Sequence, residues 1–297
     1  MIGELAALGA AVCWTVSAVL YKEVLGETKP LSANTIRGLG TSIFLLSCLV
    51  LIGWFDALTS LQVHVVFIAV ISGLIGLGLG DTLYLLSIEL LGVAKAVPIT
   101  CTYPLFSLVL AVLLAGENVT LQVVFAAVLI VSGIWLLSLE EENNTAKIHG
   151  DVLAKGIIIA LTTAFVWSVS ISLVNLTLRE VSDLEHAFAI TTLRITALAF
   201  FLLVFTPLTQ KNIVFFKMKI KNIALLLAGG IIAIGLGWFL LTLSLTYIPE
   251  SQAVPISSTT PLFSTLASII FLREKVTMKI VLGSLIIVAG VFLIFAG

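Results

Sequence analysis

The most constraining feature of this sequence is a long apolar segment that occurs twice, once at the end of each half of the chain. Residues 99–138 read ITCTYPLFSLVLAVLLAGENVTLQVVFAAVLIVSGIWLLS, and residues 256–295 read ISSTTPLFSTLASIIFLREKVTMKIVLGSLIIVAGVFLIF. At a constant offset of 157 residues, 14 of these 40 positions are identical, including the run Pro-Leu-Phe-Ser. A tandem repeat of membrane-spanning helices is typical of secondary transporters, which place the substrate site at the interface between the repeats.

The composition requires a membrane around the folded chain. Hydrophobic residues make up 60% of the sequence and charged residues 10%, whereas about a quarter of the residues in a soluble domain are charged. An apolar helix of about 20 residues spans the hydrocarbon core of a bilayer. The apolar runs therefore predict an all-α membrane protein with ten transmembrane helices. The predicted spans are 3–21, 33–53, 65–89, 94–115, 119–139, 153–176, 186–208, 222–246, 251–271 and 277–296.

Lysine and arginine are distributed unevenly between the two sets of loops. Twelve of them lie in the loops that follow the first, third, fifth, seventh and ninth spans, and only Arg179 lies in the opposite set. Loops rich in positive charge stay on the cytoplasmic side. The sequence thus predicts a multi-pass protein of the cell membrane with both termini outside.

The chain divides into two halves of five predicted helices. Residues 1–139 form the first repeat, the polar stretch 140–150 is the predicted linker, and residues 151–297 form the second. Because five is odd, the second half must enter the membrane from the opposite side, which makes the repeat an inverted one. Several paired residues share the offset, including Arg37 with Arg194 and Pro98 with Pro255.

Each half resembles an EamA domain of the drug/metabolite transporter superfamily. The resemblance rests on an aromatic residue in a small-residue first helix (AAVCWTVSA, TAFVWSVSI), an arginine early in the second, and the pattern A-x-V-P…P-L-F…E-x-V-T…G in the fourth and fifth. It implies a permease that moves small organic solutes, such as amino acids or related metabolites, commonly outward.

Asp81 is the sharpest candidate for a functional residue. It ends the run Gly-Leu-Gly-Leu-Gly-Asp and lies well inside the third predicted span. A carboxylate at that depth is costly and by default functional, either as a proton site or as a partner for a substrate amine. The alternative is a structural carboxyl group bonded to a neighbouring backbone or hydroxyl group.

Arg37 and Arg194 are the two arginines inside predicted spans. Their long side chains allow the guanidinium groups to reach opposite membrane interfaces, and this snorkelling is the favoured interpretation. Gating ion pairs and attraction of a substrate carboxylate are the alternatives.

Aromatic and hydroxyl residues deep in the spans are predicted to line a central cavity. Trp14 and Trp167 are expected to face each other across it, since both lie among small or hydroxyl residues. The remaining candidates are Asp81, Tyr84, Thr102, Tyr103, Trp238 and Thr259.

Four prolines are predicted to interrupt two of the helices. Proline removes one backbone hydrogen bond and kinks a helix. The residues concerned are Pro98, Pro104, Pro255 and Pro261. Glu117 and Glu274, by contrast, are expected to cap the fifth and tenth helices.

These patterns favour a secondary transporter, expected to be an exporter, that works by alternating access at a central cavity. A small-molecule substrate and the lipid bilayer are its predicted partners, a proton is left open, and no nucleic acid, cofactor or metal is expected. An integral membrane enzyme would need clustered catalytic groups, and a non-transporting receptor would more naturally carry a soluble output domain. The sequence has no phosphate-binding loop for ATP hydrolysis.

Overall fold

The computed structural model describes residues 1–22, 24, 28–138, 150–181, 183–209, 218–263, 265–266 and 277–295. Within these residues the chain is helical and contains no strand. The predicted linker 140–150, apart from Gly150, lies outside the described residues, as does Glu274. The elements therefore fall into two groups, one on each side of this linker.

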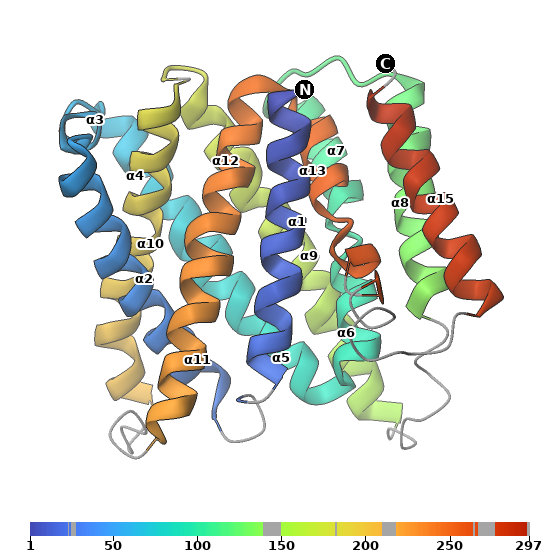
Figure 1. Cartoon of the computed structure of the whole chain (residues 1–297), viewed down its shortest axis with the longest axis horizontal. Coiled ribbons are helices and arrows are strands. Elements are labelled where there is room, and N and C mark those ends of the chain that lie inside the picture. The colour runs from blue at the N-terminus through green and yellow to red at the C-terminus, as the bar shows by residue number, and fades with distance from the viewer. Residues whose placement is uncertain are drawn as a thin grey trace.

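Within the described residues, the first group contains nine helical elements (Figure 1). They are α1 (Ile2–Lys22), α2 (Pro30–Ile52), α3 (Phe55–Thr59), α4 (Val63–Gly73), η1 (Leu74–Gly80), α5 (Asp81–Leu91), α6 (Val93–Thr100), α7 (Tyr103–Leu113) and α8 (Leu121–Ser138). The second group contains α9 (Gly150–Leu178), α10 (Leu184–Thr209), α11 (Ile220–Gly230), η4 (Ile231–Gly237), α12 (Trp238–Tyr247), α13 (Glu250–Ser257) and α15 (Met278–Phe295).

Seven of the predicted spans are helical runs long and apolar enough to cross a membrane. These runs are Pro30–Ile52, Val63–Leu91, Ala96–Leu113, Asp151–Leu178, Leu184–Thr209, Ile220–Tyr247 and Met278–Phe295. Two more predicted spans coincide with the shorter apolar helices Ile2–Ser17 and Leu121–Leu136. The remaining one, 251–271, is described only in part.

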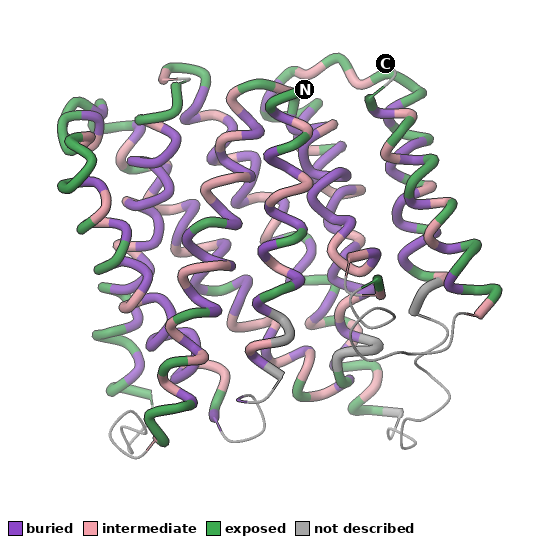
Figure 2. The backbone as a smooth tube through the Cα atoms, viewed as in Figure 1, coloured by how far each residue is buried: buried purple, intermediate pink, exposed green. Residues whose placement is uncertain are grey.

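The outer surface of the bundle is apolar. Figure 2 shows exposed positions along the outward side of the peripheral helices and buried positions between the helices. Large hydrophobic side chains such as Phe67, Phe200 and Phe292 are among the exposed ones. Soluble monomers rarely expose contiguous apolar surface of this extent, so the surface is suited to lipid.

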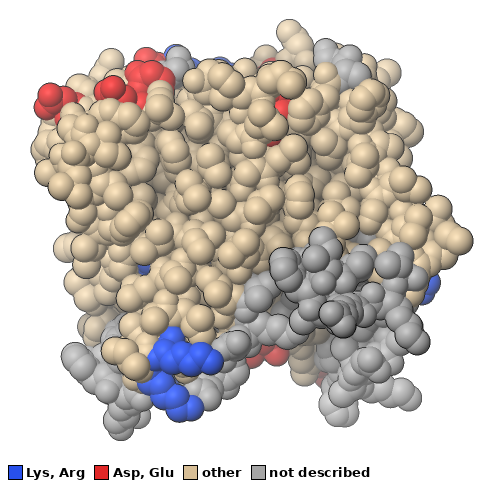
Figure 3. All heavy atoms as spheres, in the orientation of Figure 1, with Lys and Arg blue, Asp and Glu red and all other residues tan. Residues whose placement is uncertain are grey.

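The two ends of the bundle differ in charge. Both termini lie at the upper edge in Figure 1. On the face drawn in Figure 3, Lys and Arg gather mostly at the lower edge and Asp and Glu mostly at the upper edge. The described charges are thus separated along the direction in which the helices run.

Glycines allow α8 and α15 to pack closely against each other. A Cβ atom at Gly133 would lie 2.8 Å from the backbone oxygen of Gly283, and one at Gly290 would lie 2.8 Å from that of Ala126. Gly133 and Gly290 are separated by the repeat offset of 157 residues. The apolar segment that repeats in the sequence therefore forms a pair of helices joined through matched glycines.

Candidate functional site

Two π-helices lie at matched positions in the middle of long helical runs. Leu74–Gly80 (η1) joins α4 to α5, and Ile231–Gly237 (η4) joins α11 to α12, at the repeat offset of 157 residues. π-Helical turns are rare and occur frequently at functional sites. Asp81 directly follows the first and Trp238 directly follows the second, so the candidate residues begin where each π-helix ends.

Each π-helix ends at a glycine that packs closely against a tryptophan ring. A Cβ atom at Gly80 would lie 2.7 Å from Cδ1 of Trp167, and one at Gly237 would lie 2.7 Å from Nε1 of Trp14. Trp167 comes from α9 and Trp14 from α1. Each π-helix thus contacts the tryptophan contributed by the opposite half of the chain.

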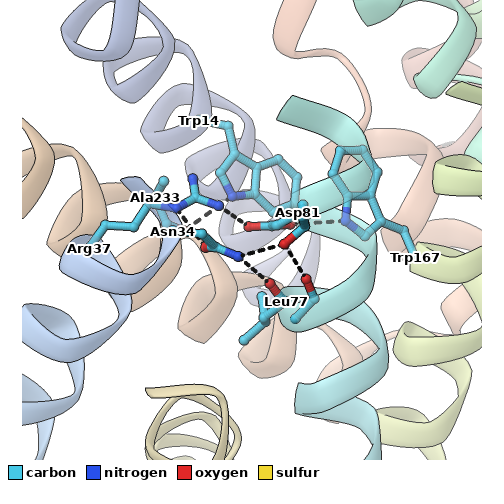
Figure 4. A network of polar contacts seen from close by, with 9 residues as sticks. Trp14, Asn34, Arg37, Leu77, Asp81, Trp167 and Ala233 are labelled. Atoms are coloured by element: carbon cyan, nitrogen blue, oxygen red, sulfur yellow. Dashed lines mark hydrogen bonds and ion pairs between the residues drawn. The ribbon is translucent and has the colours of Figure 1, made fainter. Parts of the chain in front are cut away.

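Asp81 forms a buried ion pair with Arg37. Nη2 of Arg37 lies 2.5 Å from Oδ2 of Asp81, and Trp167 donates from Nε1 to Oδ1 of Asp81 at 3.0 Å. Figure 4 shows Arg37 and Trp167 approaching the carboxylate from different sides. Arg37 and Asp81 are 4% and 6% exposed, respectively. Removing one partner of such a pair is costly, because it leaves an uncompensated charge in the protein interior.

Asn34 holds this ion pair in place. Its Oδ1 accepts a hydrogen bond from Nε of Arg37 at 2.9 Å. Its Nδ2 donates to the backbone oxygen of Leu77 in η1 at 3.0 Å, as drawn in Figure 4. Asn34 therefore orients the guanidinium of Arg37 and forms a hydrogen bond with a backbone carbonyl of the π-helix.

Arg194 occupies the matched position in the second half but has different surroundings. Its Nη2 donates to Oγ of Ser170 at 3.0 Å, and its Cζ lies 4.7 Å from the ring centroid of Trp238, a cation–π geometry. The residue is fully buried. Among the described residues, no hydrogen-bond partner reaches its Nε or Nη1. Asp81 pairs with Arg37 at the corresponding place in the first half.

The favoured interpretation of the two arginines was wrong. Neither Arg37 nor Arg194 snorkels to an interface, because both side chains are buried between helices. Asp81 forms an ion pair with Arg37. The site is a cluster of charges at the junction of the two halves.

Aromatic rings surround the cluster. The rings of Trp14 and Trp238 meet edge to face with centroids 5.8 Å apart, and Trp14 donates from Nε1 to the backbone oxygen of Ala233 in η4 at 3.2 Å. Trp167 contacts Tyr84 at 5.1 Å and Tyr103 at 6.1 Å between centroids. In Figure 4 the rings of Trp14 and Trp167 lie on different sides of the polar network.

The helices containing the four prolines are interrupted at matched positions. Helix α6 ends at Thr100 and α7 begins at Tyr103, with Pro98 before the break and Pro104 after it. In the second half α13 ends at Ser257, and residues 258–259 form the turn between Pro255 and Pro261. Hydroxyl groups at both breaks bond to backbone carbonyls. Thr102 donates to the oxygen of Ile99 at 2.7 Å and Thr259 to that of Ile256 at 2.8 Å.

Side chains from the opposite half also bond to these breaks. Ser168 of α9 donates to the backbone oxygen of Tyr103 at 2.7 Å. Thr15 of α1 donates to that of Thr260 at 3.1 Å. The Tyr103 hydroxyl lies 3.1 Å from Oγ of Ser257 and so links the two broken helices directly.

Two apolar grooves lie on the outside of the bundle rather than at this cluster. One, of about 330 Å³, is lined by α4, η1 and α10 and includes Val70, Leu74 and Phe200. The other, of about 480 Å³, is lined by α2, α11 and η4 and includes Gly40 and Leu227. None of the residues predicted to line a central cavity borders either groove.

Glu117 caps a helix other than the expected one. Its carboxylate accepts hydrogen bonds from the backbone nitrogens of Glu250 and Ser251 at 2.9 and 3.0 Å, so it caps α13 and not α8. Asn175 donates to Glu117 at 3.2 Å and to the buried carboxylate of Glu250 at 3.1 Å. Sequence proximity suggested the wrong helix because α13 is distant along the chain and close only in the fold.

Asn34, Ser170 and Glu250 are polar residues of the bundle that sequence reasoning missed. Asn34 precedes Arg37 by three residues on the same helix, a spacing that brings side chains together and was the available signal. Ser170 lies three residues after Trp167, on the same helix. Glu250 falls at the edge of a predicted span, and its contacts with Ser172 and Asn175 appear only in the fold.

Comparison with known proteins supports one family. Residues 1–139 and 154–296 each match the EamA-like transporter family. An uncharacterized transporter from Archaeoglobus fulgidus is 26% identical over 99% of this chain and 98% of its own length. Protein LicB from Haemophilus influenzae is 28% identical over 79% of this chain and 77% of its own.

The fold also has a solved counterpart. A structure described only as "Crystal structure of protein" superposes with a TM-score of 0.78 at 17% identity, covering 98% of this chain and 95% of the other. At this identity the likeness concerns the fold alone. The family matches extend over almost the whole chain, and the buried cluster lies at the junction of the two matching halves. The chain therefore belongs to the EamA-like transporter family.

Proposed function

We propose that this protein is a secondary transporter that exports small organic metabolites, such as amino acids or related compounds, across the cell membrane. The observation that carries the proposal is the buried charged and aromatic cluster built from both halves. Ionisable groups inside a membrane are costly and are retained mainly where they serve transport or gating. The outward direction rests on the resemblance of each half to an EamA domain.

The proposed architecture is ten helices in two inverted repeats. Its support is the recurrence of equivalent features at one offset: two π-helices, two helix breaks, two arginines and two helix-packing glycines. Inverted repeats can exchange conformations and open a central site to either side of the membrane in turn. In this proposal the site is the space between Trp14, Trp167, Trp238 and the arginines.

Transport by the purified protein in liposomes tests the proposal. Liposomes are loaded with a defined mixture of amino acids, organic acids and amines, and the loss of each compound is followed by mass spectrometry. We expect faster loss of one chemical group of compounds than from protein-free liposomes. If every compound is lost at the same rate with and without the protein, and the protein nevertheless binds one of them, the protein would be a receptor instead.

A proton is proposed to couple through Asp81. The carboxylate is held by Arg37 and Trp167, so it can accept a proton only in a conformation in which the contact with Arg37 is open. Coupling would then require that transport alternates between these two arrangements. Asp81→Asn is expected to remove the dependence of transport on a pH gradient, and unchanged dependence in this variant would restrict Asp81 to a structural role.

A further inference from the structure

Arg194 is a buried cation whose hydrogen-bonding capacity is only partly used. A guanidinium carries five N–H donors and no acceptor. Ser170 accepts one hydrogen bond, and the Trp238 ring covers one face. In the described part of the chain nothing bonds to Nε or Nη1. A carboxylate binds a guanidinium through two adjacent N–H groups, either those of Nη1 and Nη2 or those of Nε and Nη2. Nη2 carries two N–H groups and Ser170 accepts from it through a single hydrogen bond, so the second N–H of Nη2 can form such a pair with Nη1 or with Nε.

Arg37, at the matched position in the first half, shows which groups can bond to an arginine at this place. A carboxylate from Asp81 lies against its guanidinium, and Asn34 accepts from its Nε. The residue that corresponds to Asp81 in the second half is Trp238. This substitution places an aromatic ring where the first half has an anion, and leaves Arg194 without an ion pair among the described residues.

The cluster also carries an excess of positive charge. Arg37 and Arg194 are two cations, and Asp81 is the one carboxylate that pairs with either of them within the described residues. One further negative charge would neutralise the cluster. A monoanionic carboxylate supplies it, whereas a phosphate dianion would reverse the imbalance.

The surroundings of Arg194 are built to hold the guanidinium in one place. Ser170 exchanges hydrogen bonds with Ser72, with Oγ of Ser170 2.8 Å from the Ser72 backbone oxygen and Oγ of Ser72 3.0 Å from that of Ser170. A Cβ atom at Gly73 would lie 2.9 Å from Cα of Arg194. Arg194 is therefore fixed between α9, α4 and α12, which belong to both halves.

We propose that Arg194 binds a carboxylate group of the transported molecule, so that the substrates are small organic carboxylates, amino acids included. This inference rests on the proposed transport function and specifies its substrate class. The carboxylate bonds to the second N–H of Nη2 together with the adjacent N–H of Nη1 or Nε, and supplies the negative charge that Asp81 supplies to Arg37. The two helix breaks lie beside the tryptophans that border this position.

Binding of matched ligands tests the inference independently of transport. The probes form two sets, and within each set the apolar group is the same while the charged groups differ. The sets are phenylalanine, 3-phenylpropionate and phenethylamine, and leucine, 4-methylvalerate and 3-methylbutylamine, with acetate added as the smallest carboxylate. The melting temperature of the purified protein in detergent is recorded against probe concentration at constant ionic strength. We expect the acids or amino acids of at least one set to raise it, while the matching amine does not.

Variants connect the response to Arg194. Arg194→Met and Arg194→Lys are expected to raise the half-saturating concentration of the carboxylate by at least about tenfold, because the bidentate contact is lost. Trp238→Asp supplies an internal carboxylate at the position of Asp81 and should abolish the response. Its neutral counterpart Trp238→Asn, which lacks the ring but adds no charge, should weaken the response less than Trp238→Asp does. Arg179→Gln, just after α9, controls for non-specific anion effects.

The outcomes separate the two proposals. A response to amines alone, no response to any carboxylate, or an equal carboxylate response in Arg194→Met and the unmodified protein would overturn the inference. Should Trp238 variants fail to fold, Ser170→Ala decides, since loss of the group that orients Nη2 should weaken carboxylate binding severalfold. Transport of amines without carboxylate binding would leave the transport function standing and this inference wrong.

Discussion

At the scale of single residues, the interior contains charged side chains whose positions can be read from the sequence but whose ion-pair partners cannot. Asp81, Arg37 and Arg194 stand out in the sequence because each lies inside an apolar run. Their pairing depends on which helices become neighbours, and no spacing along the chain connects Arg37 with Asp81. The sequence therefore predicted the components of the cluster, while the fold determined that one arginine has a carboxylate and the other a tryptophan ring.

Breaking the Arg37–Asp81 pair is expected to destabilise the protein strongly. Asp81→Asn leaves the guanidinium of Arg37 buried without its counter-charge, which costs about 3–5 kcal/mol in other proteins. Thermal unfolding in detergent should show a large fall in melting temperature. The control is Glu180→Gln, whose carboxylate pairs with His64 at the surface and should contribute less than about 1 kcal/mol. Equal small effects of both changes would contradict the buried pair.

Asp183 gives a residue-scale prediction outside the membrane. Burial acts to raise the pKa of this carboxyl, but hydrogen bonds from the backbone and ring nitrogens of His186 outweigh it and lower the pKa. A lowered pKa stabilises the fold above the unfolded value of about 4, and this contribution is lost as the pH falls through the folded value. The difference in melting temperature between the unmodified protein and Asp183→Asn should thus be present above the unfolded value and vanish in acid. A difference that persists in acid would contradict the assignment.

At the scale of elements, glycine patterns were visible in the sequence but the π-helices were not. The run of alternating glycines ending at Gly80 can be read from the sequence, and the structure places a tryptophan ring against it. A π-helix differs from an α-helix only in its hydrogen-bond register, which tertiary contacts decide and residue periodicity does not reveal. The prolines, in contrast, act on the backbone locally, so the sequence indicated where α6 and α13 end.

Two glycines in η1 offer a matched test of this packing. A Cβ atom at Gly80 would lie 2.7 Å from the Trp167 ring, whereas one at Gly78 would lie 3.7 Å from Leu198. Gly80→Ala should therefore displace Trp167 and its bond to Asp81, lowering the melting temperature and shifting tryptophan emission. Gly78→Ala should leave both nearly unchanged. Similar behaviour of the two variants would show that the π-helix does not pack as described.

The cap on α13 is the second element-scale prediction. Glu117→Ala removes both hydrogen bonds to the first backbone nitrogens of α13, and loss of a helix cap costs about 1 kcal/mol. The melting temperature should fall by a few degrees. Glu117→Gln keeps an acceptor oxygen, so it should lower the melting temperature less. If Glu117→Gln lowers it as much as Glu117→Ala does, Glu117 does not act as a cap.

At the scale of the whole molecule, the repeat was the strongest predictor because it constrains many residues at once. It indicated which positions correspond, and the structure places a π-helix and a helix break at corresponding positions in both halves. It could not reveal the difference between Asp81 and Trp238, since a repeat describes what two halves share. That difference is what makes the two arginines chemically distinct.

Orientation is predicted by the separation of charge between the two ends of the bundle (Figure 3). We propose that the lower edge, with its lysines, is cytoplasmic. Single cysteines at the exposed positions Gln62 and Lys221, introduced after replacing the three native cysteines, should be treated with an impermeant thiol reagent on intact cells. The first should be labelled and the second should not. Labelling of Lys221→Cys alone would reverse the orientation.

Alternating access at the junction of the halves is the central claim, and accessibility from both sides of the membrane tests it most directly. Thr102 is half-buried at the break between α6 and α7, and Thr102→Cys changes its size little. Right-side-out and inside-out vesicles carrying this single cysteine are treated with the same impermeant reagent. The account predicts labelling from each side, with carboxylates that bind to the protein changing the two rates in opposite directions. Labelling from one side only, at a rate that no such carboxylate changes, would contradict it.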